Sequence, residues 1–127
     1  MALSTAPASA DLSQCAPGQV CLWEDDSYVP GYYGIYGTAN NMDAVRWSVG
    51  GRSAFVGNNS SSSAGYGNEC NVSLYESANQ SGHYFNYHRP SIGGTYRDPN
   101  HSNGAGWGPY AAEDWDNRVS SNRWYCA

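Results

Sequence analysis

The sequence of 127 residues predicts a single all-β domain, and three observations support this fold class. The chain holds 11 Tyr and 5 Trp, which favour strands, together with 15 Gly and many Asn and Ser residues, which supply turns. Short apolar segments alternate with these turn residues, and the segment at 20–24 recurs at 72–76. No segment approaches the roughly 18 apolar residues that a membrane-spanning helix requires. The length suits one domain with its own core.

The charge balance limits the classes of partner. The chain has 11 Asp and Glu residues against 6 Lys and Arg, so its formal net charge is −5. Nucleic acids and anionic membrane surfaces attract basic patches instead. We therefore expect neither as a partner, and we expect the protein to be monomeric.

The four cysteines predict two disulfides. Cys15 and Cys21 bracket a turn tight enough to close a local bridge, which leaves Cys70 and Cys126 to pair by elimination. In the chain-entropy model the longer loop contributes roughly 4 kcal/mol and the shorter roughly 2 kcal/mol. A zinc site is the alternative, but the spacings contain no paired C-x-x-C. Two disulfides imply an oxidising, extracytoplasmic location.

The first 14 residues are predicted to lie outside the fold. Residues 2–10 are small and uncharged, and Ala8-Ser9-Ala10 has the form of a signal-peptidase site. We expect residues 1–14 to be disordered, as a signal-peptide remnant or an added tail. The folded part is then residues 15–127 of a secreted protein.

The first half of the fold is predicted to contain three strands, at 20–24, 32–36 and 54–56. Each is a short run of apolar and aromatic residues, and an acidic turn at 24–27 follows the first. Residues 57–67 are polar and rich in glycine, so we expect an exposed loop there.

The second half repeats the first. Residues 72–76 match 20–24 position for position, 82–84 match 31–33, and the spacing from Trp115 to Ser121 matches that from Trp47 to Ser53. The chain therefore contains two copies of one unit, at about 19–57 and 70–126. The second copy carries an insertion at 90–110.

Each copy opens with a hairpin that is predicted to fold back over itself. In the second copy, Tyr75-Glu76 precedes Gly82, and glycine supplies the positive φ that this turn needs. The spacing resembles the Greek-key signature of βγ-crystallin domains, Tyr/Trp-Glu-x-x-x-Phe/Tyr-x-Gly, with Gln80 in place of the second aromatic residue. The first copy keeps that aromatic residue as Tyr28 but has one extra residue, Pro30, before its glycine.

Two further stretches carry the resemblance. Residues 116–121 resemble the Asp/Asn-Asp/Asn-x-x-Ser/Thr-Ser signature of microbial βγ-crystallins. The C-x(5)-C opening, followed by Leu-Trp-Glu, is similar to the actinobacterial metallopeptidase inhibitors, whose scaffold the Streptomyces killer-toxin-like proteins share. The implied fold is a sandwich of two intertwined Greek-key motifs, with most of the tyrosines and tryptophans in the core.

The resemblance implies a calcium site in the second copy. Its expected ligands are two side-chain oxygens, a carbonyl and a hydroxyl, from Asp116, Asn117, Arg118 and Ser120 respectively. The first copy has Ser48-Val49 and Arg52 at the matching positions, so we expect at most one weak site, at about 10⁻⁴–10⁻³ M. The acidic residues 24–26 would add charge if their turn lay nearby. A hydrogen-bonded loop without an ion is the alternative.

The resemblance also implies inhibition of an extracellular metallopeptidase by an inserted loop. A rigid loop binds tightly because it loses little entropy. The candidate loops are 93–108 and 57–67. The rival function is carbohydrate or cell-wall binding, with Tyr96, Trp107 and Tyr110 as exposed stacking residues; a purely structural role is the third.

An enzyme is not expected. The three histidines, His83, His88 and His101, form no H-E-x-x-H motif, and no G-x-S-x-G motif occurs. We expect these histidines at the surface, in polar loops.

Overall fold

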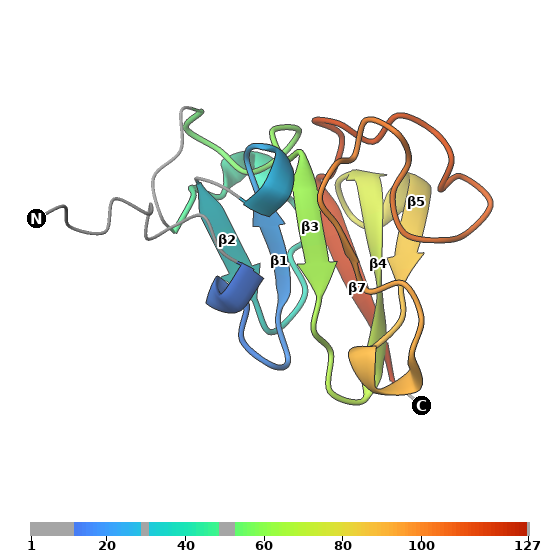
Figure 1. Ribbon diagram of the computed structural model, residues 1–127. Coiled ribbons are helices and arrows are strands. Elements are labelled where there is room, and N and C mark those ends of the chain that lie inside the picture. The colour runs from blue at the N-terminus through green and yellow to red at the C-terminus, as the bar shows by residue number, and fades with distance from the viewer. Residues whose placement is uncertain (1–11, 29–30, 49–52, 127) are drawn as a thin grey trace, which may run out of the picture.

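Two antiparallel sheets form the protein in the computed structural model, which describes residues 12–28, 31–48 and 53–126 (Figure 1). The first sheet has the order β2 (Tyr32–Ile35), β1 (Val20–Trp23), β3 (Ser62–Gly65), β6 (Arg97–Asp98). The second has the order β5 (Ser81–Tyr87), β4 (Cys70–Ser77), β7 (Ser121–Cys126). The described helices are short 3₁₀ turns: η1 (Leu12–Gln14), η2 (Asp26–Tyr28), η3 (Met42–Ala44) and η4 (Pro90–Ile92). The all-β prediction is confirmed.

Among the described residues, no helix has the length and apolar character needed to cross a membrane.

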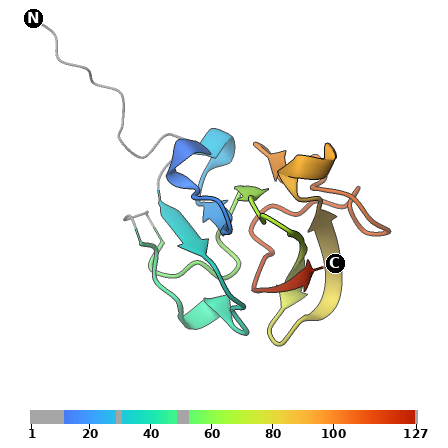
Figure 2. The ribbon, with the colours of Figure 1, turned by 90° about the horizontal axis from the view of Figure 1, so that it is seen from below.

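A segment of each half lies against the sheet of the other half. Strand β6 belongs to the second half, yet it pairs with β3 and closes the first sheet. In return, Ala39 of the first half lies against β7, where its peptide N donates to Asn122 Oδ1 at 2.8 Å and its carbonyl accepts from Asn122 N at 3.2 Å. Figure 2 shows the two sheets next to each other, seen from below. The halves are therefore intertwined, as the resemblance implies.

The segment expected to be an exposed loop at 57–67 contains an internal strand instead. Residues 60–65 are buried, and β3 lies between β1 and β6. The prediction was wrong because small polar side chains can fill a crowded sheet when their hydroxyls are paired. Ser62 Oγ donates to the Asp25 carbonyl at 2.7 Å, and Ser63 Oγ lies 2.6 Å from Tyr87 OH. A Cβ at Gly65 would lie 2.8 Å from Val72 Cγ1 of the other sheet, so a larger residue would not fit.

The first motif therefore ends near residue 65 and not at 57. The strand predicted at 54–56 is reduced to a single bridge between Arg46 and Phe55. β1 is paired on both edges, by β2 and β3, so the segment at 54–56 does not pair with it.

The main core is built from the inward faces of both sheets. Leu22 of β1, Leu74 of β4 and Phe85 of β5 are fully buried there, and Trp115 packs against Phe85 with ring centroids 4.9 Å apart. A second, smaller cluster surrounds the Cys15–Cys21 disulfide and includes Trp23 and Tyr32. Burying these large rings removes extensive apolar surface from water.

Both predicted disulfides are present. Cys15 and Cys21 close the turn before β1, with Cα atoms 5.9 Å apart. Cys70 and Cys126 are direct neighbours in the ladder between β4 and β7. Disulfides of this kind fit an oxidising environment.

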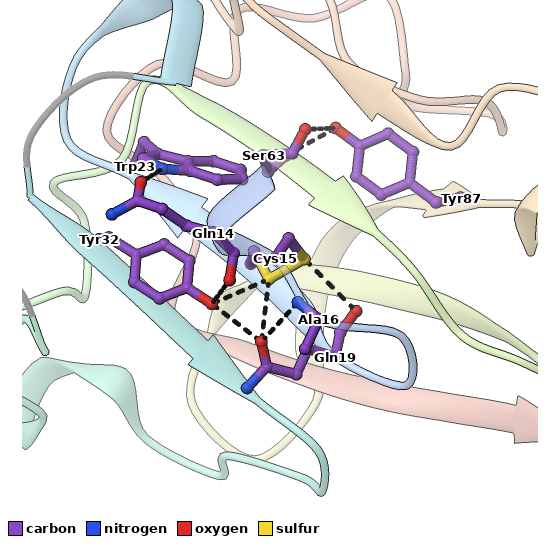
Figure 3. Close-up of a disulfide and its surroundings, with 9 residues drawn as sticks. Gln14, Cys15, Ala16, Gln19, Trp23, Tyr32, Ser63 and Tyr87 are labelled. Carbon is purple, nitrogen blue, oxygen red and sulfur yellow. Dashed lines mark hydrogen bonds between the residues drawn. A yellow bond between two sulfur atoms is a disulfide. The ribbon is translucent and has the colours of Figure 1, made fainter. Parts of the chain in front are cut away.

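Residues 12–14, which were expected to be disordered, form η1 against the smaller cluster (Figure 3). Gln14 Oε1 accepts a hydrogen bond from Trp23 Nε1 at 2.8 Å, and the Gln14 carbonyl accepts one from Tyr32 OH at 3.1 Å. The prediction failed here because a buried indole N–H needs a partner, and the disulfide at Cys15 holds that partner in place. The rest of the predicted tail, residues 1–11, lies outside the described residues.

His101 is buried and not at the surface. Its side chain is fully inaccessible, and its Nε2 lies 2.7 Å from Ser63 Oγ. Among the described residues its Nδ1 has no hydrogen-bond partner. Burial disfavours the charged imidazolium and lowers the pKa of His101 to about 4. His101 occupies the place of Met42 in the first half, since its N donates to Ser61 O as Met42 N donates to Ser120 O.

We predict that His101 makes the protein less stable in mild acid. The unfolded chain takes up a proton below pH 6.5, whereas the folded protein resists it until about pH 4, so stability falls with pH across this window. The loss approaches about 3 kcal/mol at the lower end. His101→Met should flatten this dependence, which urea unfolding from pH 7 to 4 would measure. Val56→Ala, a change at a buried apolar residue, is the control and should lower stability while keeping the parental slope; an unchanged slope in His101→Met contradicts the prediction.

Candidate functional site

Two equivalent loops lie side by side between the halves: residues 57–62, which lead into β3, and residues 116–121, which lead into β7. Asn58 N donates to Val119 O, and Asn117 N donates to Ser60 O, both at 2.9 Å. Both asparagines have a positive φ, 59° and 60°. This reciprocal pattern relates the loops by an approximate twofold axis. Asparagine suits the position because it tolerates the left-handed region better than most residues.

The prediction that the segment from Trp47 to Ser53 is the first-half counterpart of 116–121 was wrong. The structure aligns 57–62 with it, whereas Trp47 and Ser53 belong to another contact: Trp47 Nε1 donates to Ser53 Oγ at 3.0 Å. Val49 and Arg52, which were expected to weaken a first site, lie outside the described residues. The signal in the sequence is Asn58-Asn59 and the serines after it, which as a polar stretch predict an exposed loop.

The first oxygen cluster consists of Asp43, Asn58 and Ser120. Ser120 Oγ lies 3.2 Å from Asp43 Oδ1 and 3.2 Å from Asn58 Oδ1, and Asn58 Nδ2 donates to Asp43 Oδ1 at 3.3 Å. In this loop Gly57 stands where the other loop has Asp116. A Cβ at Gly57 would overlap Asp43 Oδ1, so the Asp43 carboxylate fills the space that a side chain at 57 would need.

The second oxygen cluster consists of Ser61, Asp116 and Asp26. Ser61 Oγ donates to Asp116 Oδ1. Burial, followed by repulsion from Asp116 and Asp25, raises the pKa of the Asp26 carboxyl. The acidic turn after β1 therefore lies within electrostatic reach of the loop at 116–121, which the sequence left open. Glu24 has a different role, since its Oε2 accepts from Ser53 N at 2.6 Å.

The four residues predicted as calcium ligands do not gather at one point. Asp116 belongs to the second oxygen cluster and Ser120 to the first. The Asn117 side chain is exposed. The Arg118 guanidinium binds Glu76 at 2.7 Å and lies 4.2 Å from the ring centre of Trp115, away from both clusters. Whether Arg118 O and the other groups bind an ion stays a prediction.

The donor set favours a hard cation of modest affinity. Within the described residues, no three His, Cys, Asp or Glu side chains converge as a metal site. The clusters instead combine carboxylate, amide and hydroxyl oxygens, which are ligands suited to Ca²⁺ and not to zinc.

The three aromatic residues predicted to form one interaction surface are separated. Tyr96 packs on Tyr66, with centroids 5.4 Å apart, and Tyr110 stacks on His83 at 3.9 Å. Trp107 stacks on His88 and stays 41% exposed. The insertion folds back at three places, which sequence spacing does not reveal.

Comparison with solved structures identifies the fold. A structure concerned with the evolution of the eye-lens βγ-crystallin domain fold superposes with a TM-score of 0.61 at 11% identity, covering 88% of this chain and 89% of the other. A βγ-crystallin from Ciona intestinalis gives 0.55 at 14% identity, covering 84% and 98%. A βγ-crystallin domain from Clostridium beijerinckii gives 0.53 at 17% identity, covering 84% and 97%.

No family model and no curated protein matches the sequence. At these identities the structural similarities show the βγ-crystallin fold alone, and they give no support to the finer resemblance to metallopeptidase inhibitors or killer toxins.

We predict that the second oxygen cluster is electrostatically strained without a cation. The raised pKa of Asp26 means that its charged form is disfavoured in the folded state, so its contribution to stability falls as pH rises through that pKa. Asp26→Asn should therefore stabilise the protein at pH 7 by a few tenths of a kcal/mol, small because the side chain is exposed.

Urea unfolding in low salt would measure this gain, which should vanish at about pH 3 and in about 1 M salt. Glu69→Gln, another exposed acidic side chain, is the control. A loss of stability in Asp26→Asn at pH 7, or a gain that salt does not change, contradicts the prediction.

Proposed function

We propose that this protein is an extracytoplasmic structural domain that binds Ca²⁺ weakly at its paired loops. The observation that supports the proposal is the pair of oxygen clusters beside these loops, each of which takes groups from both halves of the chain. The two disulfides support an oxidising location, and we infer that the protein is secreted.

The first oxygen cluster fits a calcium ion in kind and spacing. Ca²⁺ is held by six to eight oxygens at 2.3–2.6 Å. Oxygens 3.2 Å apart, as between Ser120 Oγ and its two partners, are spaced like neighbouring ligands of one such ion. Asp43 and Asn58 would bind through Oδ1, and Ser120 through its hydroxyl.

The second oxygen cluster offers Asp116 Oδ1 and Ser61 Oγ, with the charge of Asp26 nearby. Each cluster holds few carboxylates, and low ligand charge gives low affinity, about 10⁻⁴–10⁻³ M.

Binding at these clusters would stabilise the fold. An ion held by both halves binds the folded chain and not the unfolded one, because the ligands come together only on folding. At a Ca²⁺ concentration about ten times Kd, the free energy of unfolding would rise by about 1.4 kcal/mol per site. Ca²⁺ at extracellular concentrations would therefore stabilise the contact between the two halves, but only weakly.

We predict that isothermal titration calorimetry with CaCl₂ detects two sites of about 10⁻⁴–10⁻³ M. Ser120→Ala should weaken the first site and Ser61→Ala the second, each several-fold, because each removes one oxygen. The control is Ser91→Ala, an exposed serine of η4 that belongs to neither cluster. Absence of binding at about 10 mM Ca²⁺ would contradict the calcium proposal.

Inhibition of a metallopeptidase is the second candidate function, because one exposed loop is held in place as an inhibitory loop must be. Residues 57–67 cannot insert into a protease cleft, because 60–65 are buried in the first sheet. Backbone hydrogen bonds to β5 and the residue after it hold residues 93–108 near both ends. His88 N donates to Thr95 O at 2.8 Å, and Asn86 exchanges backbone hydrogen bonds with Trp107. Gly93, Gly94 and Thr95 are exposed. An exposed loop that is already held at both ends loses little conformational entropy on binding.

The inhibitor function predicts that the protein slows a thermolysin-like peptidase but not serine or cysteine peptidases, in steady-state assays run with Ca²⁺ and with a chelator. Ile92, which is 50% exposed beside this loop, provides the variant: Ile92→Ala should weaken inhibition. Tyr36→Ala, an exposed residue of the first half, should not. Inhibition of none of the three classes would remove this candidate and leave the calcium proposal untouched.

A further inference from the structure

The outward face of the second sheet carries polar and aromatic residues. Alternate residues of a strand point to opposite faces, and Val72 and Leu74 of β4 are buried in the core. Asn71 and Ser73 therefore lie on the outward face. On β5 the same alternation places Tyr84 and Asn86 there, and β7 adds Tyr125. Figure 1 shows β5, β4 and β7 as neighbours at one side of the molecule.

The insertion adds Trp107 to this face. Asn86 N donates to Trp107 O at 2.9 Å, and Trp107 N donates to Asn86 O at 3.0 Å. Residues directly opposite in such a bridge project to the same side of a sheet. The Trp107 indole stacks on His88, with centroids 4.7 Å apart and planes inclined by 11°, and it is still 41% exposed.

Glycines on both sides of Trp107 permit this close approach. Gly106 and Gly108 have φ values of 58° and 128°. A Cβ at Gly106 would overlap Asn86 O and lie 2.8 Å from Phe85 Cδ2. The run Gly-Trp-Gly therefore lets the backbone lie against β5 while one aromatic ring projects over the outward face.

Together these residues line a groove of about 340 Å³. We call its polar lining residues, Asn71, Ser73 and Asn86, the floor and its aromatic ones, Tyr84, Trp107 and Tyr125, the walls; Pro109 completes the lining. The floor is ordered by hydrogen bonds: Ser73 Oγ donates to Asn86 Oδ1, and Asn86 Nδ2 donates to Trp107 O at 3.2 Å.

Two further hydrogen bonds decide which groups a ligand would meet. Asn71 Oδ1 accepts from Arg89 N at 2.9 Å, so its Nδ2 is the group left to donate. Tyr125 OH bonds Tyr75 OH at 2.9 Å, which holds this wall although Tyr125 is 43% exposed.

We propose that this groove binds a neutral pyranose oligosaccharide. A sugar ring has an apolar C–H face, which packs on an aromatic ring, and hydroxyls at its edge, which pair with amides and hydroxyls. The groove offers both kinds of group, and none of the described residues that line it is charged, although the Arg123 guanidinium lies 5.0 Å from the centre of the Tyr125 ring. The net charge of −5 also disfavours anionic glycans. The volume lies at the lower end of the range for small-molecule sites. A proline-rich peptide would use the aromatic walls but would offer fewer acceptors than a sugar to Asn71 Nδ2, the floor group left to donate.

This site is separate from the oxygen clusters, so it does not depend on the proposed calcium function. Of the residues that the sequence suggested for stacking, Trp107 lines the groove, whereas Tyr96 and Tyr110 do not.

The test is an NMR titration of the ¹⁵N-labelled protein with N-acetylchitotriose and, separately, cellotriose, each to about 10 mM and in the presence of a chelator. We expect shifts of the Asn71 and Asn86 side-chain amides and of the Trp107 indole N–H with at least one sugar. The two sugars distinguish an acetamido-bearing ligand from a plain glucan.

Trp107→Ala and Tyr125→Ala should each weaken binding about tenfold or more, and dispersed spectra would show that both variants are folded. Tyr36→Ala is the matched control, since Tyr36 is 65% exposed and does not line the groove, and it should bind as the parent does. The proposal is overturned if neither sugar shifts the groove resonances, if the shifts lie elsewhere, if Tyr36→Ala loses as much as Trp107→Ala, or if only a proline-rich peptide binds there.

Discussion

The pair of backbone hydrogen bonds between the loops at 57–62 and 116–121 is the constraint on which the rest of the structure depends. Asn58 N to Val119 O and Asn117 N to Ser60 O are long-range contacts, and each loop leads directly into a strand of its own sheet. Fixing one loop against the other therefore sets where β3 and β7 begin. It also brings Ser120 to Asp43 and Ser61 to Asp116, so the oxygen clusters are a consequence of this pairing.

The same pairing explains why a strand of serines can be internal. Once β3 is held between β1 and β6, its hydroxyls face fixed partners: Ser62 Oγ meets Asp25 O, and Ser63 Oγ meets both Tyr87 OH and His101 Nε2. A buried hydroxyl with a partner costs little, whereas one without a partner costs roughly 1–3 kcal/mol. The small volume of serine, alanine and glycine then allows the sheets to approach closely. The neutral, buried His101 is part of this arrangement, and it ties the stability of the first sheet to pH.

The two candidate binding features arise in different ways. The oxygen clusters come from the paired loops: Ser61 of one corresponds to Ser120 of the other, whereas Asp116 has Gly57 as its counterpart. The groove on the second sheet comes from the insertion, because Trp107 reaches β5 only through the glycines beside it, and the first half has no equivalent insertion. The oxygen clusters therefore depend on loops that both halves share, whereas the groove depends on a segment of the second half alone.

The sequence by itself determined the fold class, both disulfide pairings and the duplication, because these depend on local patterns: strand-forming residues, cysteine spacing, and the recurrence of 20–24 at 72–76. It also singled out Asp116 and Ser120, but it could not place them in different clusters. Only the tertiary structure decided that residues 57–62 are the partner loop, that Ser62–Gly65 is a central strand, and that His101 is buried. The physical reason is the same in each case. These polar residues are buried where distant groups accept or donate their hydrogen bonds, and those partners lie far away in the sequence, 77 residues for Ser120 and Asp43 and 83 residues for Asn122 and Ala39.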